Sequence, residues 1–297
     1  GLPLILLATF GIGIGVGTAG AIPSMIVARR IPMRPALGTG AYASGIAAGS
    51  ALAAALAIPL AVDGQWRMSL LALSLGSFLC VAAWLVLSRG PGDDRPTTAV
   101  PAMRLPWRST TAWVLVFVFG LQSIQFYGVS AWIPNVYVER GWTPASAAAL
   151  VAILNGIGLF TTIGVPLVAD RLGARRLQLV IASIIGTGAL VGITLVPDPA
   201  YLWVAILGLA LGAIFPLVLT LPIDVADDPA RVGSVAALML LGGYILSSTG
   251  PVVLGAARDL TGNFEASLWL LSLVGVALTG TCLLLSPERL RRGIGRA

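Results

Sequence analysis

Nine long apolar stretches constrain the fold of this chain more than any other feature of its sequence. Each is close to the roughly 20 residues that an α-helix needs to cross the hydrocarbon core of a bilayer, and none carries Asp, Glu, Lys or Arg near its centre. Because backbone polar groups in lipid must find partners within their own segment, we expect each stretch to form a transmembrane helix. The stretches are 3–28, 37–62, 68–87, 112–134, 145–168, 177–196, 201–222, 232–256 and 266–285.

The composition points to the same environment. Charged residues make up 10% of the chain and hydrophobic residues 57%, whereas an average soluble domain has about 25% charged residues. The mean hydropathy is +0.95. We therefore predict an all-α, polytopic membrane protein whose surface contacts the lipid bilayer.

The net charge of +6 does not indicate a nucleic-acid partner. The chain has no Lys, so its 18 basic residues are all Arg, and they fall between the apolar stretches. Its two cysteines, Cys80 and Cys282, lie inside apolar stretches, where we interpret them as packing residues. The chain has no His, and we predict no metal site, no cofactor and no catalytic residue.

The Arg residues set the predicted orientation. Alternate connections hold fifteen of the 18, and the other connections hold only Arg67, Arg140 and Arg258. Cytoplasmic loops carry an excess of basic residues, so we place the Arg-rich connections in the cytoplasm, although the one after 201–222 holds three Asp residues against one Arg. We predict a multi-pass protein of the cell membrane, in bacteria the cell inner membrane, with a cytoplasmic C-terminus.

Two internal resemblances indicate that the chain repeats itself. Residues 66–75 resemble 264–273, and residues 10–15 resemble 207–212 at nearly the same offset. The first three apolar stretches then correspond to the last three, and the middle three would have partners ahead of Gly1. Parallel repeats of six helices are the plan of a large class of transporters, so we expect nine visible helices of twelve.

Four regions follow from this repeat. We predict that 1–88 is the remainder of an N-terminal helix bundle with three spans, and that 111–286 is a C-terminal six-helix bundle. The segment 89–110 begins Arg-Gly-Pro-Gly-Asp-Asp-Arg-Pro, which disfavours a helix, so we interpret it as the central cytoplasmic linker. Residues 287–297 form the predicted cytoplasmic tail.

The connection after 145–168 carries a motif. From residue 166 to residue 176 it reads Pro-Leu-Val-Ala-Asp-Arg-Leu-Gly-Ala-Arg-Arg. This resembles the Gly-x-x-x-Asp-Arg-x-Gly-Arg-Arg signature of the major facilitator superfamily, with Pro at the first Gly and Ala at the first of the paired Arg residues. The resemblance implies a cytoplasmic loop between the second and third helices of the C-terminal half, whose Asp and Arg groups latch neighbouring helices. The motif residues are Asp170, Arg171, Gly173, Arg175 and Arg176.

Three further segments narrow this resemblance. They are residues 119–134, the pair Trp66-Arg67, and Gly250-Pro251 followed by Ala-Arg-Asp-Leu-Thr-Gly at 257–262. These segments resemble the branch of the superfamily that contains cyanate permeases and nitroimidazole transporters. The resemblance implies secondary active transport of a small solute, either a small anion or a small polar organic molecule, by alternating access. We expect the protein to be a monomer.

Polar residues near the middle of the apolar stretches are the candidates for lining a substrate cavity. Amide and phenol groups are unfavourable against lipid, so they should face the interior of the bundle, where transporters bind their substrates. For Gln122 and Gln125, lining a cavity and bonding between helices stay open alternatives. We favour a cavity-lining role for Asn155 and Tyr244, and bonding between helices for Tyr42. The candidates are Gln122, Gln125, Phe126, Asn155, Tyr244 and Tyr42.

No ionisable residue lies near the centre of these stretches, although proton-coupled carriers usually place one within the membrane. A coupling proton or ion would then bind in helices ahead of Gly1, or the protein is a uniporter or an exchanger. An anionic substrate such as cyanate would likewise need a basic residue there.

Other function classes fit the sequence less well. A membrane-embedded enzyme needs a nucleophile with a base, a metal cluster or paired acids, and a channel usually needs a charge ring or a carbonyl filter; the sequence has no such pattern. The alternative that stays open is an inactive or repurposed fragment on a transporter fold, acting as a receptor or scaffold.

Overall fold

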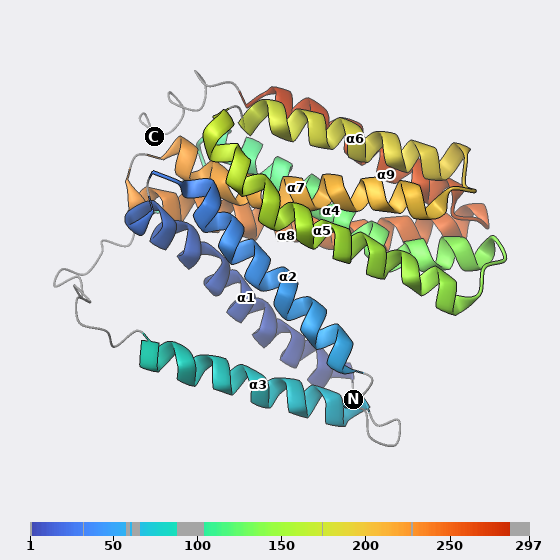
Figure 1. The fold of residues 1–297 in the computed structure, drawn as a ribbon, viewed down its shortest axis with the longest axis horizontal. Coiled ribbons are helices and arrows are strands. Elements are labelled where there is room, and N and C mark those ends of the chain that lie inside the picture. Colours follow the sequence, from blue (N-terminus) through green and yellow to red (C-terminus); the bar gives the residue numbers. More distant parts are fainter. Residues whose placement is uncertain are drawn as a thin grey trace. The chain divides into compact units, whose positions relative to one another are not determined.

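The structure is a computed structural model that describes residues 2–31, 33–57, 60, 66–87, 104–173, 175–226 and 228–285. Every regular element within these ranges is an α-helix, so the predicted all-α class is confirmed for them. The helices are α1 (Leu2–Arg30), α2 (Pro35–Ala57), α3 (Trp66–Leu87), α4 (Thr110–Glu139), α5 (Pro144–Leu172), α6 (Arg175–Leu195), α7 (Ala200–Val225), α8 (Pro229–Thr261) and α9 (Glu265–Leu283) (Figure 1).

Among the described residues, six helices are long and apolar enough to cross a membrane, namely α4 to α9. Each of the nine predicted spans overlaps one of the helices α1 to α9, and residues 58, 59, 61 and 62 of the predicted span 37–62 lie outside the described residues. Membrane crossing by α1, α2 and α3, and with it the count of nine spans out of twelve, stays a prediction. The longest apolar helical stretch found in α3 is Arg67–Ala83.

Some helices extend further than their apolar stretches predicted. The stretch 112–134 ended at Pro134, yet α4 continues to Glu139 with Pro134 inside it. An interior proline removes one backbone hydrogen bond and can kink a helix, but here the remaining bonds carry the helix onward. Helix α4 begins at an N-cap, because the side chain of Ser109 accepts a hydrogen bond from the backbone N–H of Ala112 at 3.3 Å.

The chain divides into two compact units, 1–44 with 103–297 and, separately, 45–102. The second unit holds the later part of α2 and all of α3. The predicted boundaries at 88, 110 and 286 stay predictions. Of the predicted linker 89–110 only residues from 104 onward are described, and the predicted tail 287–297 lies outside the described residues.

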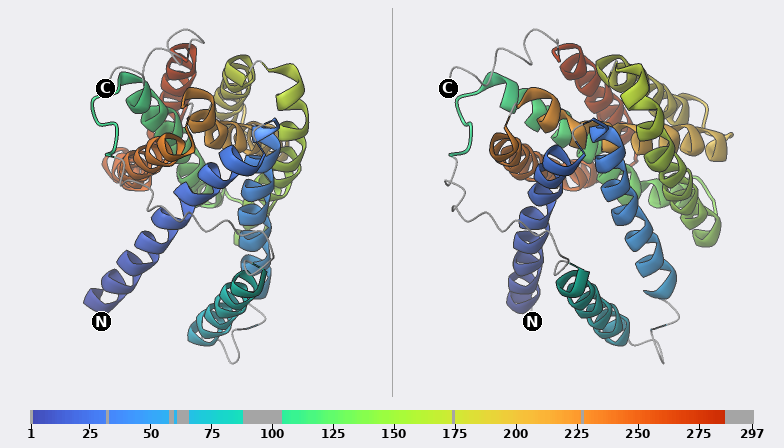
Figure 2. Two further views of the ribbon diagram at one scale, coloured as in Figure 1. Left: turned by 90° about the vertical axis from the view of Figure 1, so that its left-hand side faces the viewer. Right: turned by 60° about the vertical axis from the view of Figure 1, so that its left-hand side comes forward.

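Helices α4 to α9 run alongside one another in the larger unit (Figures 1 and 2). Helix α7 packs between α5 and α6, α9 packs on α6 and α4, and α4 packs along α8. The buried apolar side chains form two main clusters, each drawn from several of these helices. Helix α1 belongs to the same unit and packs on α8.

Glycines bring α4 and α8 close together. A Cβ atom at Gly120 would meet the side chain of Leu246, and one at Gly250 would lie 3.0 Å from Ile124. The residue numbers rise together along both helices, so the pair is parallel. Large side chains of one helix fill the spaces that glycines leave on the other, as at close helix contacts in membranes generally.

The crossing of α5 and α7 is tighter still. A Cβ atom at Gly208 would lie 2.6 Å from the backbone oxygen of Leu154, and one at Gly212 would overlap the backbone of Gly158. Thr162 on α5 donates a hydrogen bond of 3.0 Å to the Gly212 carbonyl of α7. Backbone therefore contacts backbone at this crossing.

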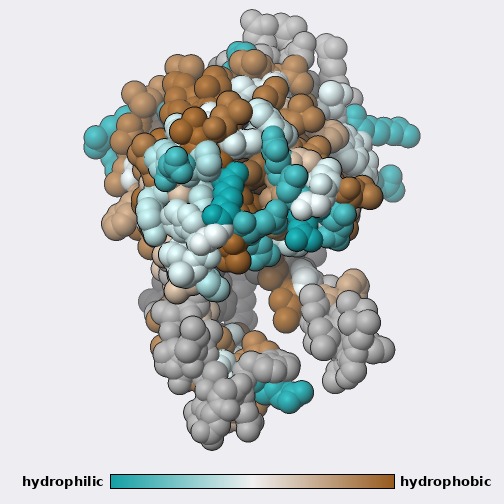
Figure 3. Space-filling model, turned by 90° about the vertical axis from the view of Figure 1, so that its right-hand side faces the viewer, coloured by the Kyte–Doolittle hydropathy of each residue, from teal (hydrophilic) through white to brown (hydrophobic). Residues whose placement is uncertain are grey.

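The two ends of the bundle carry aromatic side chains. At the end of α4, the Tyr137 ring packs at a tilt against Trp142, which contacts Tyr201 at the start of α7. At the opposite end Trp107 contacts Trp113, whose indole N–H donates to the Trp107 carbonyl at 2.8 Å. Aromatic belts of this kind mark the two membrane–water interfaces. Figure 3 looks onto the end where α4 turns into α5 and shows hydrophilic residues gathered there, flanked by hydrophobic ones.

Candidate functional site

The predicted motif lies at the turn from α5 to α6. Helix α5 ends at Gly173, whose φ of 62° lies in the left-handed region and whose N–H donates to the Ala169 carbonyl at 3.0 Å. Glycine reaches this conformation without the steric cost of a Cβ atom. The turn is so short that Asp170, in the last turn of α5, and Arg175, at the start of α6, come into contact.

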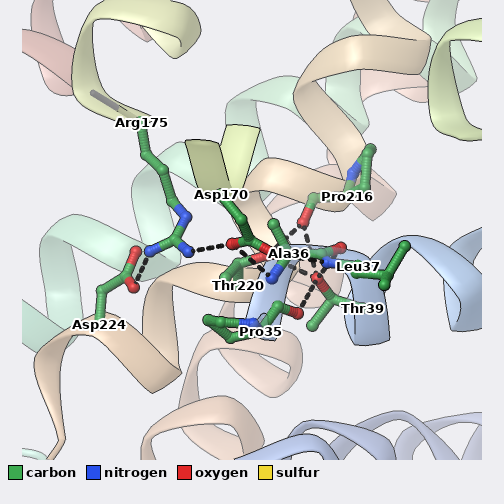
Figure 4. Close-up of polar contacts among 9 residues, drawn as sticks. All are labelled: Pro35, Ala36, Leu37, Thr39, Asp170, Arg175, Pro216, Thr220 and Asp224. Carbon is green, nitrogen blue, oxygen red and sulfur yellow. Dashed lines mark hydrogen bonds and ion pairs between the residues drawn. The ribbon is translucent and has the colours of Figure 1, made fainter. Parts of the chain in front are cut away.

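Asp170 binds the N-terminus of α2. One carboxylate oxygen accepts a hydrogen bond from the backbone N–H of Ala36, and the other from that of Leu37, each at 3.1 Å (Figure 4). These are among the first N–H groups of the helix, which have no partner within it. A carboxylate at this end also interacts favourably with the helix dipole. Asp170 thus caps a helix distant in sequence.

Arg175 joins two carboxylates. One guanidinium nitrogen lies 2.7 Å from Asp170 and the other is paired with Asp224 at the end of α7. The three side chains are 11% to 20% exposed, so solvent screens the contacts only in part. The forked guanidinium allows one side chain to hold α5 and α7 together, and through Asp170 the chain of contacts reaches α2 (Figure 4). We call Asp170, Arg175 and Asp224 the latch.

Two buried contacts lie beside the latch. Thr39 of α2 and Thr220 of α7 share a hydrogen bond of 2.5 Å between their hydroxyl oxygens. Gly40 of α2 packs against the ring of Pro166 on α5, so closely that a Cβ atom would overlap it. Pro166 stands where the family signature has Gly. The small residue that permits close approach is therefore found on α2 instead.

The remaining motif residues lie apart from these contacts. Arg176 donates a hydrogen bond of 2.8 Å to the Leu283 carbonyl at the end of α9, where a basic group complements the helix dipole. Arg171 is exposed in the last turn of α5. The structure thus brings Asp170 and Arg175 together, gives Arg176 a separate partner, and assigns Gly173 the turn.

The cavity candidates do not lie in one place. Gln122 and Gln125 are 2% and 1% exposed, and the Gln125 amide nitrogen lies against Gly275 of α9 with no hydrogen-bond partner among the described residues. Asn155 is exposed and donates to the Val151 carbonyl of its own helix at 3.0 Å. Phe126 and Tyr42 are half-buried against different apolar clusters. Their roles stay predictions.

Tyr244 lines a hollow of about 530 Å³ between α4 and α8. Its walls are mostly apolar with several hydroxyl groups, and none of the lining side chains is charged. The lining residues are Tyr127, Ser130, Ala131, Tyr244, Ser247, Ser248 and Pro251.

Several of these residues were not identified from the sequence, although the position or spacing of some of them in the sequence indicates their role. In the sequence Asp224 counts only as one of three Asp residues that weaken the orientation rule, although an acid directly after an apolar stretch indicates a nearby basic partner. Tyr127 and Ser130 are three residues apart on one helix face, as are Tyr244 and Ser247. Thr39 had no signal, because its partner lies on α7, distant in sequence.

Comparison with known proteins agrees with this fold. A family model described as Major Facilitator Superfamily matches residues 1–251. The 2-nitroimidazole transporter of Escherichia coli (strain K12) is 28% identical over 278 residues, which are 93% of this chain and 69% of that protein. The cyanate transport protein CynX of the same strain is 28% identical over 255 residues, 85% of this chain and 66% of that protein.

A solved structure is similar in fold. The major facilitator transporter FucP, crystallised in the outward conformation, superposes with a TM-score of 0.71 at 13% sequence identity, covering 93% of this chain and 73% of that chain. The chain spans about two thirds of the length of the curated relatives described above.

Proposed function

This chain belongs to the major facilitator superfamily, and we propose that it carries a small solute across the cell membrane by secondary active transport with alternating access. Three observations support the proposal. Six of its described helices have the length and apolarity to cross a membrane. Its relatives include named transporters. A charged latch joins its helices at one end.

The observation that carries the mechanism is the pairing of Asp170 with the N-terminus of α2. Alternating access needs contacts at one end that form in one state and break in the other. Charge-assisted hydrogen bonds are each worth about 1.5–3 kcal/mol, so a few of them bias a two-state equilibrium without locking it. The latch lies at the end where α5 turns into α6 and α7 into α8, and we place this end in the cytoplasm because these connections belong to the Arg-rich set.

The names of two relatives support the class of solute that we propose. A nitroimidazole and cyanate are both small and polar, and we propose a small anion or a small polar organic molecule for this chain. The described Asp and Glu residues all lie near helix ends, so coupling to a proton or another ion would use the latch carboxylates or groups outside the described residues. A receptor or scaffold role stays the alternative.

Counterflow tests the proposal. The product of the native gene would be reconstituted into liposomes loaded with unlabelled 2-nitroimidazole or cyanate, and uptake of the labelled solute measured. We expect uptake above that of protein-free liposomes for at least one solute, reduced when Asp170→Asn weakens the latch. Asp259→Asn, on an exposed side chain near the end of α8, is the control. Uptake equal to that of empty liposomes for both solutes contradicts the proposal and favours the receptor or scaffold role.

A further inference from the structure

The hollow between α4 and α8 is built from regularly spaced residues. On α8 its lining is Tyr244, Ser247, Ser248 and Pro251, and on α4 it is Tyr127, Ser130 and Ala131. Within each helix these positions are three and four apart, so they form one continuous face. Both faces lie at or just beyond the middle of helices that run from Thr110 to Glu139 and from Pro229 to Thr261. The hollow is therefore at the depth where carriers bind substrate.

Several hydroxyl groups of this face lack protein partners. The Ser130 hydroxyl is buried and makes no hydrogen bond within the described part of the chain. The phenol oxygens of Tyr127 and Tyr244 likewise make no hydrogen bond to another described residue. A buried hydroxyl without a partner costs about 1–3 kcal/mol, so the Ser130 hydroxyl gains from a ligand that supplies a donor or acceptor, and the two phenol oxygens are available to the same ligand.

Each of the two tyrosine rings of the hollow packs edge-to-face against a phenylalanine ring. Tyr244 makes an edge-to-face contact with Phe119 at 5.0 Å between ring centroids, and Tyr127 makes one with Phe126 at 5.4 Å. Tyr127 nevertheless keeps 43% of its surface exposed. The rings thus offer fixed aromatic surface, which favours flat partners by stacking or edge contact.

We propose that this face binds an uncharged solute with a planar ring, whose polar atoms bond to Tyr127, Ser130 and Tyr244. The inference rests on the proposed transport function and narrows its substrate. No lining side chain of the hollow is charged, and moving an ion out of water without a paired charge is far costlier than moving a neutral polar group. The rings supply contact area and the hydroxyls supply orientation.

Matched pairs of ligands test the charge preference. Binding of benzamide and benzoate, and of nicotinamide and nicotinate, would be measured by calorimetry on the purified full-length protein. Each pair shares a ring and differs mainly in charge at neutral pH. We expect at least one amide to bind at up to about 10 mM and to bind more tightly than its carboxylate, by about tenfold or more, since tenfold corresponds to 1.4 kcal/mol.

Variants test the residues. Tyr127→Phe keeps the ring and Ser130→Ala keeps the backbone, and each should weaken amide binding by about tenfold, as expected for the loss of one hydrogen bond. Tyr201→Phe, and Ser234→Ala on α8 outside the hollow, should bind as the parent does. Tighter binding of the carboxylates, unchanged binding by both hollow variants, or no amide bound at about 10 mM each overturns the inference. If an amide binds but neither solute shows counterflow, the result contradicts the proposed transport function and still supports the binding site proposed here.

Discussion

Asp170 meets three groups on two other helices at once. Its two oxygens accept backbone N–H groups of Ala36 and Leu37 and also face Arg175. The resemblance in the sequence implied that Asp170 and Arg175 connect helices. It did not identify their partners, because the unpaired N–H groups of a helix N-terminus and a distant acid, Asp224, have no motif of their own. Only the packing of α2, α5 and α7 brings these groups together.

The fork of Arg175 yields a prediction at this scale. Arg175→Lys keeps the charge but offers a single ammonium group, which cannot bond to Asp170 and Asp224 in the same geometry. We expect a loss of about 1.5–3 kcal/mol in the free energy of unfolding, the contribution of one hydrogen bond to a charged group, seen as a lower midpoint of thermal unfolding in detergent. Arg171→Lys, on an exposed side chain, should leave the midpoint unchanged. Equal midpoints for the two variants would show that the fork is dispensable.

The helices themselves could be predicted from the sequence, because hydrocarbon permits few other structures for apolar segments of this length. Their contacts could not. Apolar residues cover all sides of α5 and α7, so the sequence indicates no preferred face for packing. The structure shows which glycines matter: Gly212 touches the backbone of Gly158, whereas a Cβ atom at Gly156 or Gly188 would meet nothing within 4 Å.

This difference predicts opposite effects of one substitution. Gly212→Ala places a methyl group against backbone that cannot move aside, and overpacking of this kind costs about 1–3 kcal/mol. Gly188→Ala in α6 should stabilise by up to about 1 kcal/mol, because alanine is the better helix former. Thermal unfolding of the two purified variants checks the signs. A Gly212→Ala protein as stable as the Gly188→Ala protein would mean that the α5–α7 crossing is looser than described.

At the scale of the whole molecule, the described connections α1–α2, α5–α6 and α7–α8, which carry Arg residues, lie at one end of the larger unit. The end of α5, the end of α7 and the start of α2 meet there in the latch. The distribution of Arg predicts which side of the membrane this end faces, whereas the fold shows only that these connections are neighbours. The expectation of three further helices ahead of Gly1 stays a prediction.

Orientation can be measured with fusions to the C-terminus. If the Arg-rich end is cytoplasmic, a C-terminal green fluorescent protein should fluoresce and a C-terminal alkaline phosphatase should be inactive. The same reporters placed at Gly141, between α4 and α5, should give the opposite pattern. Active phosphatase at the C-terminus would reverse the predicted topology and move the latch to the outer side.

The central claim is that the latch holds α2 against α5 and α7 and opens during transport. Spin labels at Arg34 and Arg231, both exposed near the latch end, would report the separation by pulsed electron paramagnetic resonance, in a protein whose exposed Cys80 is replaced by Ala. We predict one short-distance population in the parent protein and a second, longer one in the Asp170→Asn variant. A distance distribution that Asp170→Asn and a transported solute both leave unchanged would contradict the account.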